Sequence, residues 1–258
     1  MPLFTARVLA NQEVAHDYYQ LDFSWISDAP RPVPGQFLTV RVGSSGVPLL
    51  RRPFAFSDAA GERASMIYWR RGDATRAIAG YQPGDAIDVM GPLGVAFPEP
   101  TDGAVPVLIA GGVGVGPILF LANALAARAP YPILLIGARS AQGLPRVRVD
   151  GRVQLRTATD DGSAGYAGTV IDLLDRTLDI TAGDVELYLC GPNPMLRAGH
   201  DLAARHGIPA WVSMEQTMGC AVGACMGCAI HLTGVERYAR VCTEGPVFRS
   251  TDVDWERL

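Results

Sequence analysis

Four of the five cysteines in this chain lie in one short stretch near its C-terminus. Their order and spacing are Cys220-x4-Cys225-x2-Cys228-x13-Cys242. A C-x4-C-x2-C run with a distant fourth cysteine is the spacing of plant-type [2Fe–2S] ligands, in which four thiolates hold two irons. Small residues such as Gly223 let the backbone turn sharply and bring its N–H groups close to the sulfurs. The four cysteines are therefore the predicted metal ligands.

Two alternatives to this cluster stay open from the spacing alone. A structural zinc site with four cysteines usually pairs two C-x2-C knuckles, and this stretch has only one, at Cys225 and Cys228. Buried structural thiols are the second alternative. The zinc alternative would describe a zinc-stabilised module that binds a nucleotide without redox turnover.

Composition limits the classes of protein to which the chain can belong. Its 258 residues predict two compact domains and a small appendage. A net charge of -4 gives no reason to expect nucleic acid or an anionic membrane as a partner. All 22 basic residues are arginine, which excludes lysine Schiff-base chemistry and a Walker-type phosphate lysine.

The N-terminal sequence has no apolar core or cleavage site of a signal peptide. We therefore expect a cytoplasmic protein whose cysteines bind metal in a reducing compartment. The uncharged run Val105–Ala127 is long enough to cross a bilayer. Glycines and Pro117 interrupt it in the middle, so a strand, a glycine loop and a helix are expected instead of a membrane span.

Residues 1 to about 98 contain short segments that mix β-branched or aromatic residues with alternation and are separated by turns. They predict a small antiparallel barrel. The expected strands are Phe4–Leu9, Tyr18–Trp25, Gln36–Val42, Pro53–Ser57, Ser65–Arg70 and Ala86–Met90.

Candidate ligand-binding residues fall within this barrel. Arg52 beside a strand can clamp a pyrophosphate, Phe54 can lie against a planar ring, and a turn at Gly72 can offer N–H groups to phosphate. Each of these features also has a structural explanation, since such arginines often lie in solvent and Phe54 can be an ordinary core residue.

The pattern changes at about residue 104, where the apolar run Val105–Ala110 precedes a glycine loop and the helix-like Ile118–Arg128. This order is how an α/β sheet presents backbone N–H groups and a helix N-terminus to a dinucleotide. The match to G-x-G-x-x-G is imperfect. The candidate dinucleotide-binding residues here are Gly111, Gly112, Gly114, Gly116 and Pro117.

Further apolar and amphipathic segments continue this alternation and predict a parallel sheet covered by helices. The expected strands are Ile133–Gly137, Val153–Thr157 and Val185–Leu189, and the expected helices are Thr169–Leu178 and Pro194–His206. Cys190, Gly191 and Pro192 follow the last of these strands, at the edge where such sheets bind ligands. Cys190 is either a buried small apolar residue or a neighbour of the nicotinamide.

A flavin-type barrel, a nicotinamide-type domain and a one-electron cluster together predict an electron converter. NAD(P)H gives up two electrons as a hydride and the cluster accepts one at a time, so a flavin must mediate between them. No catalytic acid, base or nucleophile is expected. The four histidines lie in no functional motif: His16, His200, His206 and His231.

Seven motifs carry a resemblance to a known family: LLRRPFAFS, IDVMGPLG, IAGGVGVGP, ATDDGSAG, CGPNPM, MEQTMGCAVGACMGC and VCTEGPVF. In this order the chain resembles the electron transfer subunits of NAD-dependent, two-subunit dihydroorotate dehydrogenases, within the ferredoxin reductase superfamily. The resemblance implies FAD, NAD(H) and a [2Fe–2S] cluster as cofactors. It also implies an FMN-containing catalytic subunit as partner in a two-plus-two heterotetramer, which oxidises dihydroorotate in pyrimidine biosynthesis.

The same resemblance implies three segments and a set of FAD contacts. The segments are an FAD-binding barrel at 1–100, an NAD-binding α/β domain at 101–208 and a cluster-binding segment at 209–258. Ala55 stands where the family usually has serine, and Ser57 is expected on the same face of its strand. The turn before Thr75 is shorter than in the family. The implied FAD-binding residues are Arg52, Pro53, Phe54, Ala55, Ser57, Arg70, Arg71, Gly72 and Thr75.

Other acceptors for the electrons remain alternatives. Related subunits serve NADP transhydrogenases and hydrogenases, and a self-contained oxygenase reductase would usually carry a full ferredoxin domain. NADH rather than NADPH is inferred from the family alone, since four residues can in principle meet the 2′-phosphate of NADPH: Arg139, Ser140, Arg146 and Arg148. If the cluster passes electrons to another protein, an exposed patch is expected around Cys225–Cys228.

Overall fold

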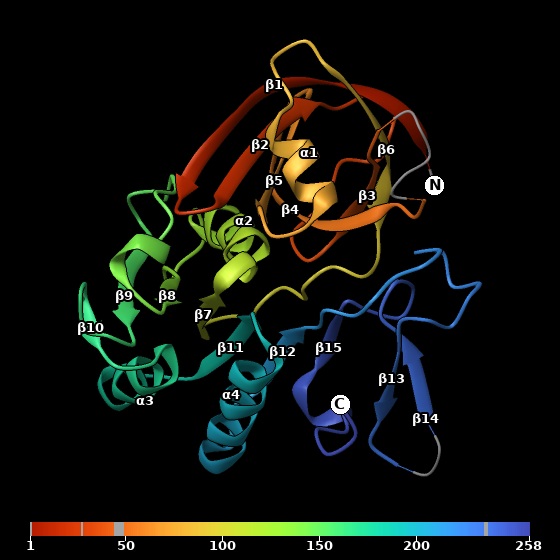
Figure 1. Cartoon of the computed structure of the whole chain (residues 1–258). Coiled ribbons are helices and arrows are strands. Elements are labelled where there is room, and N and C mark those ends of the chain that lie inside the picture. The colour runs from red at the N-terminus through yellow and green to blue at the C-terminus, as the bar shows by residue number, and fades with distance from the viewer. Residues whose placement is uncertain (1, 27, 44–48, 235–236) are drawn as a thin grey trace.

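The computed structural model describes residues 2–26, 28–43, 49–234 and 237–258. Parts of the first and third predicted segments lie outside these ranges. Figure 1 shows a barrel above a twisted sheet, with a hairpin beside the C-terminal part of the sheet. No helix in the described ranges is long and apolar enough to span a bilayer.

The N-terminal part is a closed antiparallel barrel with the strand order β1-β2-β5-β4-β3-β6. Its strands are β1 (Leu3–Ala15), β2 (Tyr18–Ser24), β3 (Phe37–Arg41), β4 (Arg52–Ala60), β5 (Arg63–Trp69) and β6 (Ala86–Leu93). Side chains on β3 alternate between the inside and the outside of the barrel. Leu38 and Val40 lie in the barrel core, whereas Thr39 points to the other side, next to its partners on β4 and β6. The predicted antiparallel barrel is therefore confirmed.

A short helix, α1 (Asp73–Ala79), lies between β5 and β6. The sequence pattern predicts only strands and turns in this region, so α1 is a correction. Ala74 and Ile78 are buried four residues apart, but two turns are too short for a helical period to stand out from the surrounding strands.

The second part is a seven-stranded sheet with the order β10-β9-β8-β7-β11-β12-β15, parallel except for β15. Its strands are β7 (Val105–Gly111), β8 (Ile133–Ala138), β9 (Gln154–Thr159), β10 (Tyr166–Ala167), β11 (Val185–Cys190), β12 (Ala210–Ser213) and β15 (Val247–Arg249). The expected parallel α/β arrangement is confirmed.

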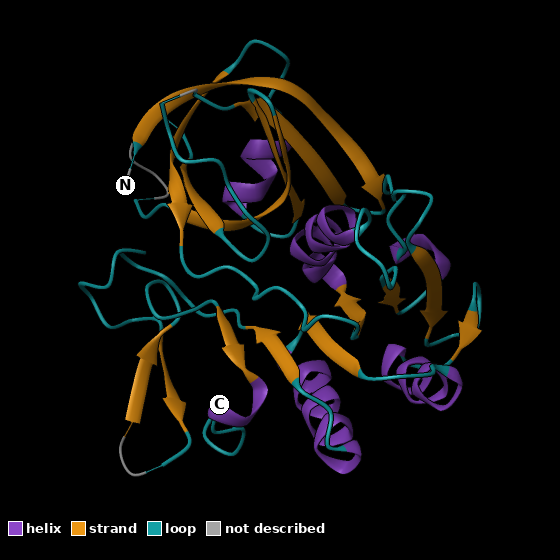
Figure 2. Ribbon diagram, turned by 180° about the vertical axis from the view of Figure 1, so that it is seen from behind, coloured by secondary structure: helices purple, strands orange, loops and turns teal. Residues whose placement is uncertain are grey.

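Helices cover both faces of this sheet, as the alternating residues of β7 indicate. Leu108 and Ala110 pack with α2 (Val115–Leu125). Val107 and Ile109 lie in a core with α3 (Val170–Ile180) and α4 (Asn193–His206). Short 3-10 turns connect some elements: η1 (Gly112–Gly114), η2 (Ala141–Gly143) and η3 (Ser250–Asp252). Figure 2 shows α2 between the sheet and the barrel, with α3 and α4 on the far side of the sheet.

Local signals account for where these helices begin and end. The Thr169 hydroxyl accepts a hydrogen bond from the Asp172 N–H and caps α3. Pro192 precedes α4, and Gly207 with φ +66° ends it. Helix α2 starts at Val115, three residues before the predicted start, because the glycine loop closes in a single 3-10 turn.

The C-terminal part contributes to the sheet as well as forming its own hairpin. Strands β12 and β15 extend the sheet beyond β11, so the sheet continues past the expected boundary at 208. Strands β13 (Ala229–Leu232) and β14 (Arg237–Arg240) form a separate two-stranded sheet in the described part of the chain, and Leu232 also forms an isolated bridge with Val253. None of these strands was expected, because three or four residues are too few to show a strand period.

Candidate functional site

Strands β4 and β5 separate along part of their length. β4 pairs with β3 along Arg52–Ala55 but with β5 only along Phe56–Ala60. β5 continues to Trp69 with β2 as its only partner among the described strands. The segments Arg52–Ala55 and Ile67–Trp69 therefore each keep one backbone edge free, which we call the β4–β5 opening. Such edges offer N–H and C=O groups to the polar rim of a flat ligand.

Aromatic side chains lie beside the β4–β5 opening. Phe54 contacts Tyr68 edge-on, with ring centroids 6.1 Å apart. Trp69 stacks on Tyr18 with the rings 6.0 Å apart and 3° from parallel, and Trp69 stays 40% exposed. Flat apolar surfaces of this kind suit a planar ring. Tyr18 and Trp69 were missed by the sequence analysis, and only the strand pairing that joins them would have revealed them.

The three predicted arginines, Arg52, Arg70 and Arg71, differ in the groups that they already contact. Arg70 is already held by Asp17, with Nε to Oδ1 at 3.0 Å, and also donates to the Tyr19 hydroxyl. Arg52 donates to the Leu50 carbonyl at 2.7 Å, and the Arg71 guanidinium lies 4.9 Å from the centre of the Trp69 ring. Neither Arg52 nor Arg71 forms an ion pair with a described carboxylate, so both can meet a phosphate.

The turn before α1 is closed by Thr75. Its hydroxyl accepts hydrogen bonds from the N–H groups of Arg71 and Gly72 at 3.0 and 3.1 Å. It also donates to the Gly72 carbonyl. The amides expected to meet a phosphate at Gly72 are thus used within the turn, and those of the first turn of α1 remain.

Ser57 lies where the barrel meets the second part of the chain. Its side chain faces Gly116 of α2, where an added Cβ would come within 3.5 Å of the serine Cβ. Its hydroxyl is buried and has no hydrogen-bond partner in the described part of the chain, and the same holds for Thr39 on β3. A buried hydroxyl normally has a partner. Thr39 lies on β3 opposite Pro53, and Ser57 follows the Arg52–Ala55 segment in β4, so both unsatisfied hydroxyls belong to the neighbourhood of the opening.

The glycine loop after β7 lies against the end of β11. The two strands are parallel neighbours, with Ala110 opposite Cys190. A Cβ on Gly114 would be 2.1 Å from the Cys190 carbonyl oxygen, so only glycine permits this approach. Gly112, with φ +56°, faces the Tyr18 hydroxyl, at 3.5 Å from an added Cβ. The loop therefore touches both the sheet edge and the barrel.

The second predicted turn, Cys190-Gly191-Pro192, meets Gly111 at the same edge. Met195 of α4 covers both glycines, because an added Cβ on Gly111 or Gly191 would lie within 2.6 Å of its side chain. Burial raises the pKa of the Cys190 thiol to about 12. Cys190 is therefore a neutral thiol at the predicted nicotinamide edge.

The predicted cluster cysteines lie on a loop between β12 and β13 and on the turn after β14. Ala221 and Met226 are non-glycine residues with φ near +60°, and Gly223 has φ +82°. These left-handed positions fold the chain around Cys220, whose sulfur accepts N–H bonds from Val222, Ala224 and Cys225 at 3.3 to 3.4 Å. Backbone amides aimed at a sulfur are what an iron–sulfur ligand loop requires.

Hydrogen bonds and burial give the thiols different acidities. The backbone N–H bonds, chiefly that of Val222, lower the pKa of Cys220 to about 6. Burial raises the pKa of Cys242 to about 11. The Cys225 N–H donates to the Cys220 sulfur at 3.3 Å, and Cys228 and Cys242 are buried in one core. In the described ranges, no three His, Cys, Asp or Glu side chains gather around one metal position. The spacing of the four cysteines and the amides aimed at Cys220 fit the predicted cluster.

One side of this loop is open to solvent. Cys225 is exposed, as are Val222 at 40% and Met226 at 53%. Cys228 and Cys242 are buried. The structure thus places an exposed apolar patch where the sequence analysis expected one, and we call Val222, Cys225 and Met226 the cluster patch.

The buried side of the cluster loop packs against the barrel. Phe37 of β3 and Leu93 of β6 share one core with Ala221, Cys228 and Cys242. Just beyond β6, the Val95 N–H donates to the Gly245 carbonyl at 2.7 Å. Phe37 also lies opposite Ala55 of the β4–β5 opening. The opening and the cysteine loop therefore border the same packed region.

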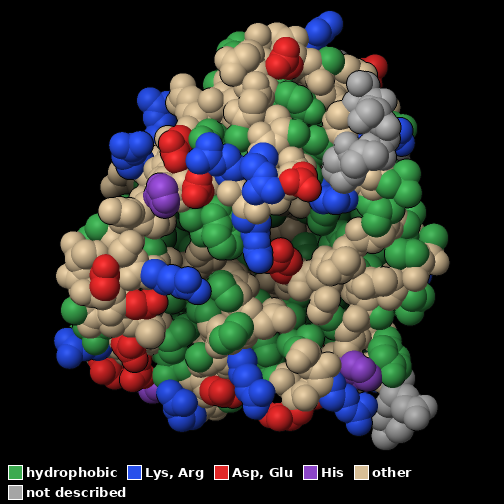
Figure 3. Space-filling view, in the orientation of Figure 1, with side chains coloured by type: hydrophobic (Ala, Val, Ile, Leu, Met, Phe, Trp, Pro, Cys, Tyr) green, Lys and Arg blue, Asp and Glu red, His purple; other side chains and the backbone are tan. Residues whose placement is uncertain are grey.

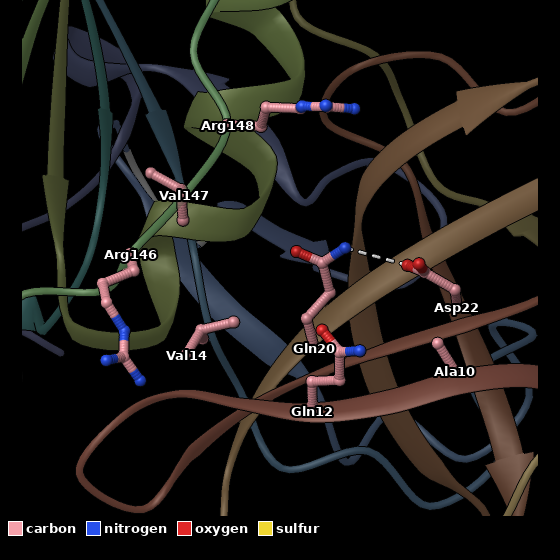
Figure 4. A pocket seen from close by; sticks show the side chains of 8 residues that line it. All are labelled: Ala10, Gln12, Val14, Gln20, Asp22, Arg146, Val147 and Arg148. Atoms are coloured by element: carbon pink, nitrogen blue, oxygen red, sulfur yellow. Dashed lines mark hydrogen bonds between the residues drawn. The ribbon is translucent and has the colours of Figure 1, made fainter.

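The described surface has a hollow between the barrel and the sheet, and grooves along the outside of the barrel. Figure 3 shows a hollow between the barrel and the sheet on the face of the molecule drawn in Figure 1, with arginine and acidic side chains at its rim. A separate groove of about 380 Å³ lies between the outside of β1 and β2 and the loop 146–148. Figure 4 shows Arg146 and Arg148 pointing apart at this groove, which contains none of the implied FAD-binding residues and none of the glycine-loop residues.

Together, the barrel with its β4–β5 opening, the dinucleotide-type sheet edge and the four-cysteine loop define a reductase of the ferredoxin reductase class with an iron–sulfur segment. A solved structure, that of the NADH-dependent reduced ferredoxin-NADP oxidoreductase, superimposes with a TM-score of 0.86 at 28% identity, over 97% of this chain and 90% of that one. The ferredoxin reductase of carbazole 1,9a-dioxygenase shares the fold, with a TM-score of 0.70 at 23% identity over 81% of this chain and 68% of its own.

The family is settled by sequence. Residues 215–254 match the iron-sulfur cluster binding domain of dihydroorotate dehydrogenase B. The dihydroorotate dehydrogenase B (NAD(+)) electron transfer subunit of Desulforamulus reducens is 36% identical, over 98% of this chain and 99% of its own length. That of Geobacillus kaustophilus is 40% identical, over 95% and 96%. The chain belongs to the family of dihydroorotate dehydrogenase B electron transfer subunits, as its motifs predicted.

Proposed function

We propose that this chain transfers electrons between NAD(H), FAD and a [2Fe–2S] cluster, and exchanges them with an FMN-containing dihydroorotate dehydrogenase catalytic subunit. The observation that carries the proposal is that the β4–β5 opening lies beside the glycine loop and α2 and borders the packed core that contains the buried cysteines. The net reaction of the assembly is the oxidation of dihydroorotate to orotate, with its two electrons reducing NAD+ to NADH. A bound flavin supplies the step between one-electron and two-electron chemistry.

FAD is assigned to the β4–β5 opening and the turn that follows it. The free edges of Arg52–Ala55 and Ile67–Trp69 support this assignment, since they hold the backbone groups that a flavin rim needs. We assign phosphate contacts to Arg52, Arg71 and the first turn of α1. Arg70 positions this turn through Asp17. The remaining proposed contacts are Pro53, Phe54, Ala55, Ser57, Gly72 and Thr75.

NAD(H) is assigned to the carboxyl edge of β7 and β11. The close approach of Gly114 to Cys190 supports the assignment, because it holds the glycine loop and the start of α2 at the carboxyl end of β11. Gly116 brings α2 onto Ser57 and so places this edge beside the flavin strand. The proposed contacts are Gly111, Gly112, Gly114, Gly116, Pro117, Cys190, Gly191 and Pro192.

The cluster is assigned to Cys220, Cys225, Cys228 and Cys242. The spacing of the cysteines and the N–H bonds to Cys220 support this assignment. The four thiolates would hold the two irons. Cysteine ligands without a disulfide partner fit a reducing cytoplasm, where we place the protein.

We further propose that the chain works as three segments, 1–100 for FAD, 101–208 for NAD(H) and 209–258 for the cluster. The third segment lends β12 and β15 to the sheet of the second. In the assembly, the cluster patch faces the catalytic subunit, and two copies of each subunit form a heterotetramer.

The decisive experiment purifies the chain from its host without air and follows NADH oxidation with orotate as the only acceptor. We expect a flavin and iron–sulfur spectrum that bleaches with NADH, and FMN in a co-purifying subunit. Cys225→Ser should abolish transfer to orotate while NADH still reduces the flavin, because it removes a predicted iron ligand distant from the glycine loop.

Two results would contradict the proposal in different ways. Bleaching by NADH without orotate turnover would keep the electron converter and assign it another acceptor, such as the ferredoxin and NADP of the structural relative. A colourless protein that contains zinc instead of iron would remove the redox function altogether.

A further inference from the structure

We propose that Arg240, oriented by Glu244, is a positioning residue for the predicted cluster: it braces the loop between Cys220 and Cys225 and raises the reduction potential of the cluster with its positive charge. The inference rests on the assignment of the four cysteines made above. It adds two charged residues that are not among the predicted ligands or contacts.

The first contact joins Arg240 to the middle of the cysteine loop. Its Nη1 donates to the Gly223 carbonyl at 2.8 Å. Gly223 has φ +82°, and a Cβ there would lie 3.2 Å from the same Nη1. The guanidinium therefore packs directly over a loop position that only glycine adopts without strain.

Glu244 fixes the direction of the guanidinium. Its carboxylate accepts from Arg240 Nε at 3.0 Å and also from Nη2. The same carboxylate accepts from the Arg240 N–H at 2.7 Å and from the Thr243 hydroxyl at 3.0 Å. Four donors on one carboxylate leave Glu244 little freedom, so Arg240 is held in one orientation.

This arrangement connects the two halves of the cluster site. Arg240 ends β14 and is two residues before Cys242, whereas Gly223 lies between Cys220 and Cys225. The Val241 N–H, next in the chain, donates to the Cys228 carbonyl at 3.1 Å. Bracing Gly223 also steadies the neighbouring amides of Val222 and Ala224, which donate to the Cys220 sulfur.

The positive charge of Arg240 and the N–H bonds that it steadies both raise the reduction potential of the cluster. A cluster with four thiolates is negative, and gaining an electron makes it more so. A guanidinium, which is protonated at all relevant pH values, favours the reduced state when it lies nearby. N–H bonds to sulfur favour the reduced state as well. Glu244 opposes this effect with its own charge but maintains the geometry.

The test is a redox titration of the complete subunit complex, with the reduced cluster measured by electron paramagnetic resonance. Arg240→Gln should lower the midpoint potential, and Arg240→Lys should recover part of the shift because it keeps the charge. Glu244→Gln should raise the midpoint, since the loss of a negative charge beside the cluster outweighs the loosening of the N–H bonds to sulfur. Both neutral variants should lose iron to a chelator several-fold faster, because each releases the brace.

Arg237→Gln is the matched control, since Arg237 is an exposed arginine on the same strand, at its opposite end. It should leave both the midpoint and the iron loss unchanged. The proposal is overturned if Arg240→Gln matches this control, or if the two neutral variants shift the midpoint in the same direction. If Arg240→Gln fails to fold, the midpoint potentials of Arg240→Lys and Glu244→Gln still test the proposal. A wild-type complex without iron or signal would instead refute the cluster assignment.

Discussion

Cys220 and Cys242 serve the same predicted cluster from opposite environments. Cys220 lies in a loop whose amides stabilise its thiolate, whereas Cys242 is buried beside Cys228. Before metal binds, the site thus holds one preformed thiolate and one thiol that ionises only with difficulty. Metal binding must displace the proton from the second, which couples assembly of the cluster to pH.

The acidity of Cys220 predicts its reactivity in the cluster-free chain. Its pKa falls from 9.0 to about 6, so its alkylation rate should rise through about pH 6 and then level off. Cys242, with a pKa of about 11, should react slowly in that range. Mass spectrometry of iodoacetamide-labelled peptides at several pH values measures both rates. A Cys220 rate still climbing at about pH 9 would contradict the expectation.

The lowered pKa of Cys220 also makes the free energy of unfolding of the cluster-free chain depend on pH. Because the folded-state pKa of Cys220 is lowered, its contribution to stability is complete above the unfolded value of 9.0. The contribution is lost as the pH falls from there through about 6.

At the scale of elements, the site depends on where strand pairing stops and on how α2 and the glycine loop pack against the strands. β4 pairs with β5 only from Phe56 onward, so its edge before Phe56 is exposed, and α2 packs across the same strand where Gly116 approaches Ser57. The glycine loop reaches the end of β11 at Gly114. One element interface thus positions both the flavin edge and the dinucleotide edge.

Gly114→Ala tests this interface. The new methyl would lie 2.1 Å from the Cys190 carbonyl oxygen, and backbone atoms cannot yield as a flexible side chain can. We expect a loss of about 3 kcal/mol in the free energy of unfolding and a much slower reduction of the flavin by NADH. Urea denaturation and stopped-flow absorbance measure the two effects.

Gly151→Ala is the control, because no atom lies within 4 Å of an added Cβ there. It should change neither quantity. Equal behaviour of the two variants would show that the contact with Cys190 does not shape the loop.

At the scale of the whole molecule, the chain is arranged so that electrons can enter and leave at different surfaces. The glycine edge lies between sheet and barrel, and the cluster patch lies on the C-terminal loop. The packed region between them contains Phe37 and the buried cysteines. An exposed apolar patch beside a redox centre is a docking surface by default.

Met226→Asp should therefore weaken association with the catalytic subunit. Met226 is 53% exposed in the cluster patch, and a buried charge at a subunit interface opposes binding. We expect a rise in Kd of about 10-fold to 100-fold, with the visible spectrum of the free subunit unchanged. Isothermal calorimetry or gel filtration of the mixed subunits measures it.

Ile180→Asp serves as the comparison, since Ile180 is 71% exposed on α3. This helix lies on the opposite side of the sheet from the barrel in Figure 2. Its substitution should leave association intact. If both variants bind as the wild type does, the cluster patch is not the interface.

The sequence by itself determined the chemistry and the order of the parts. The cysteine spacing, the strand–glycine–helix order at Val105–Leu125 and the motifs around Arg52 are local patterns, and local patterns predict the elements that contain them. Helix α1 and strands β12 to β15 were missed because they are too short to carry a period.

Only the tertiary structure decided how these parts meet. The stacking of Tyr18 on Trp69, the contact of Gly114 with Cys190 and the brace from Arg240 to Gly223 each join residues far apart in the chain. Such contacts depend on strand register and on which element packs across which. Spacing along the sequence does not encode these relations, because they arise only when distant segments fold against one another.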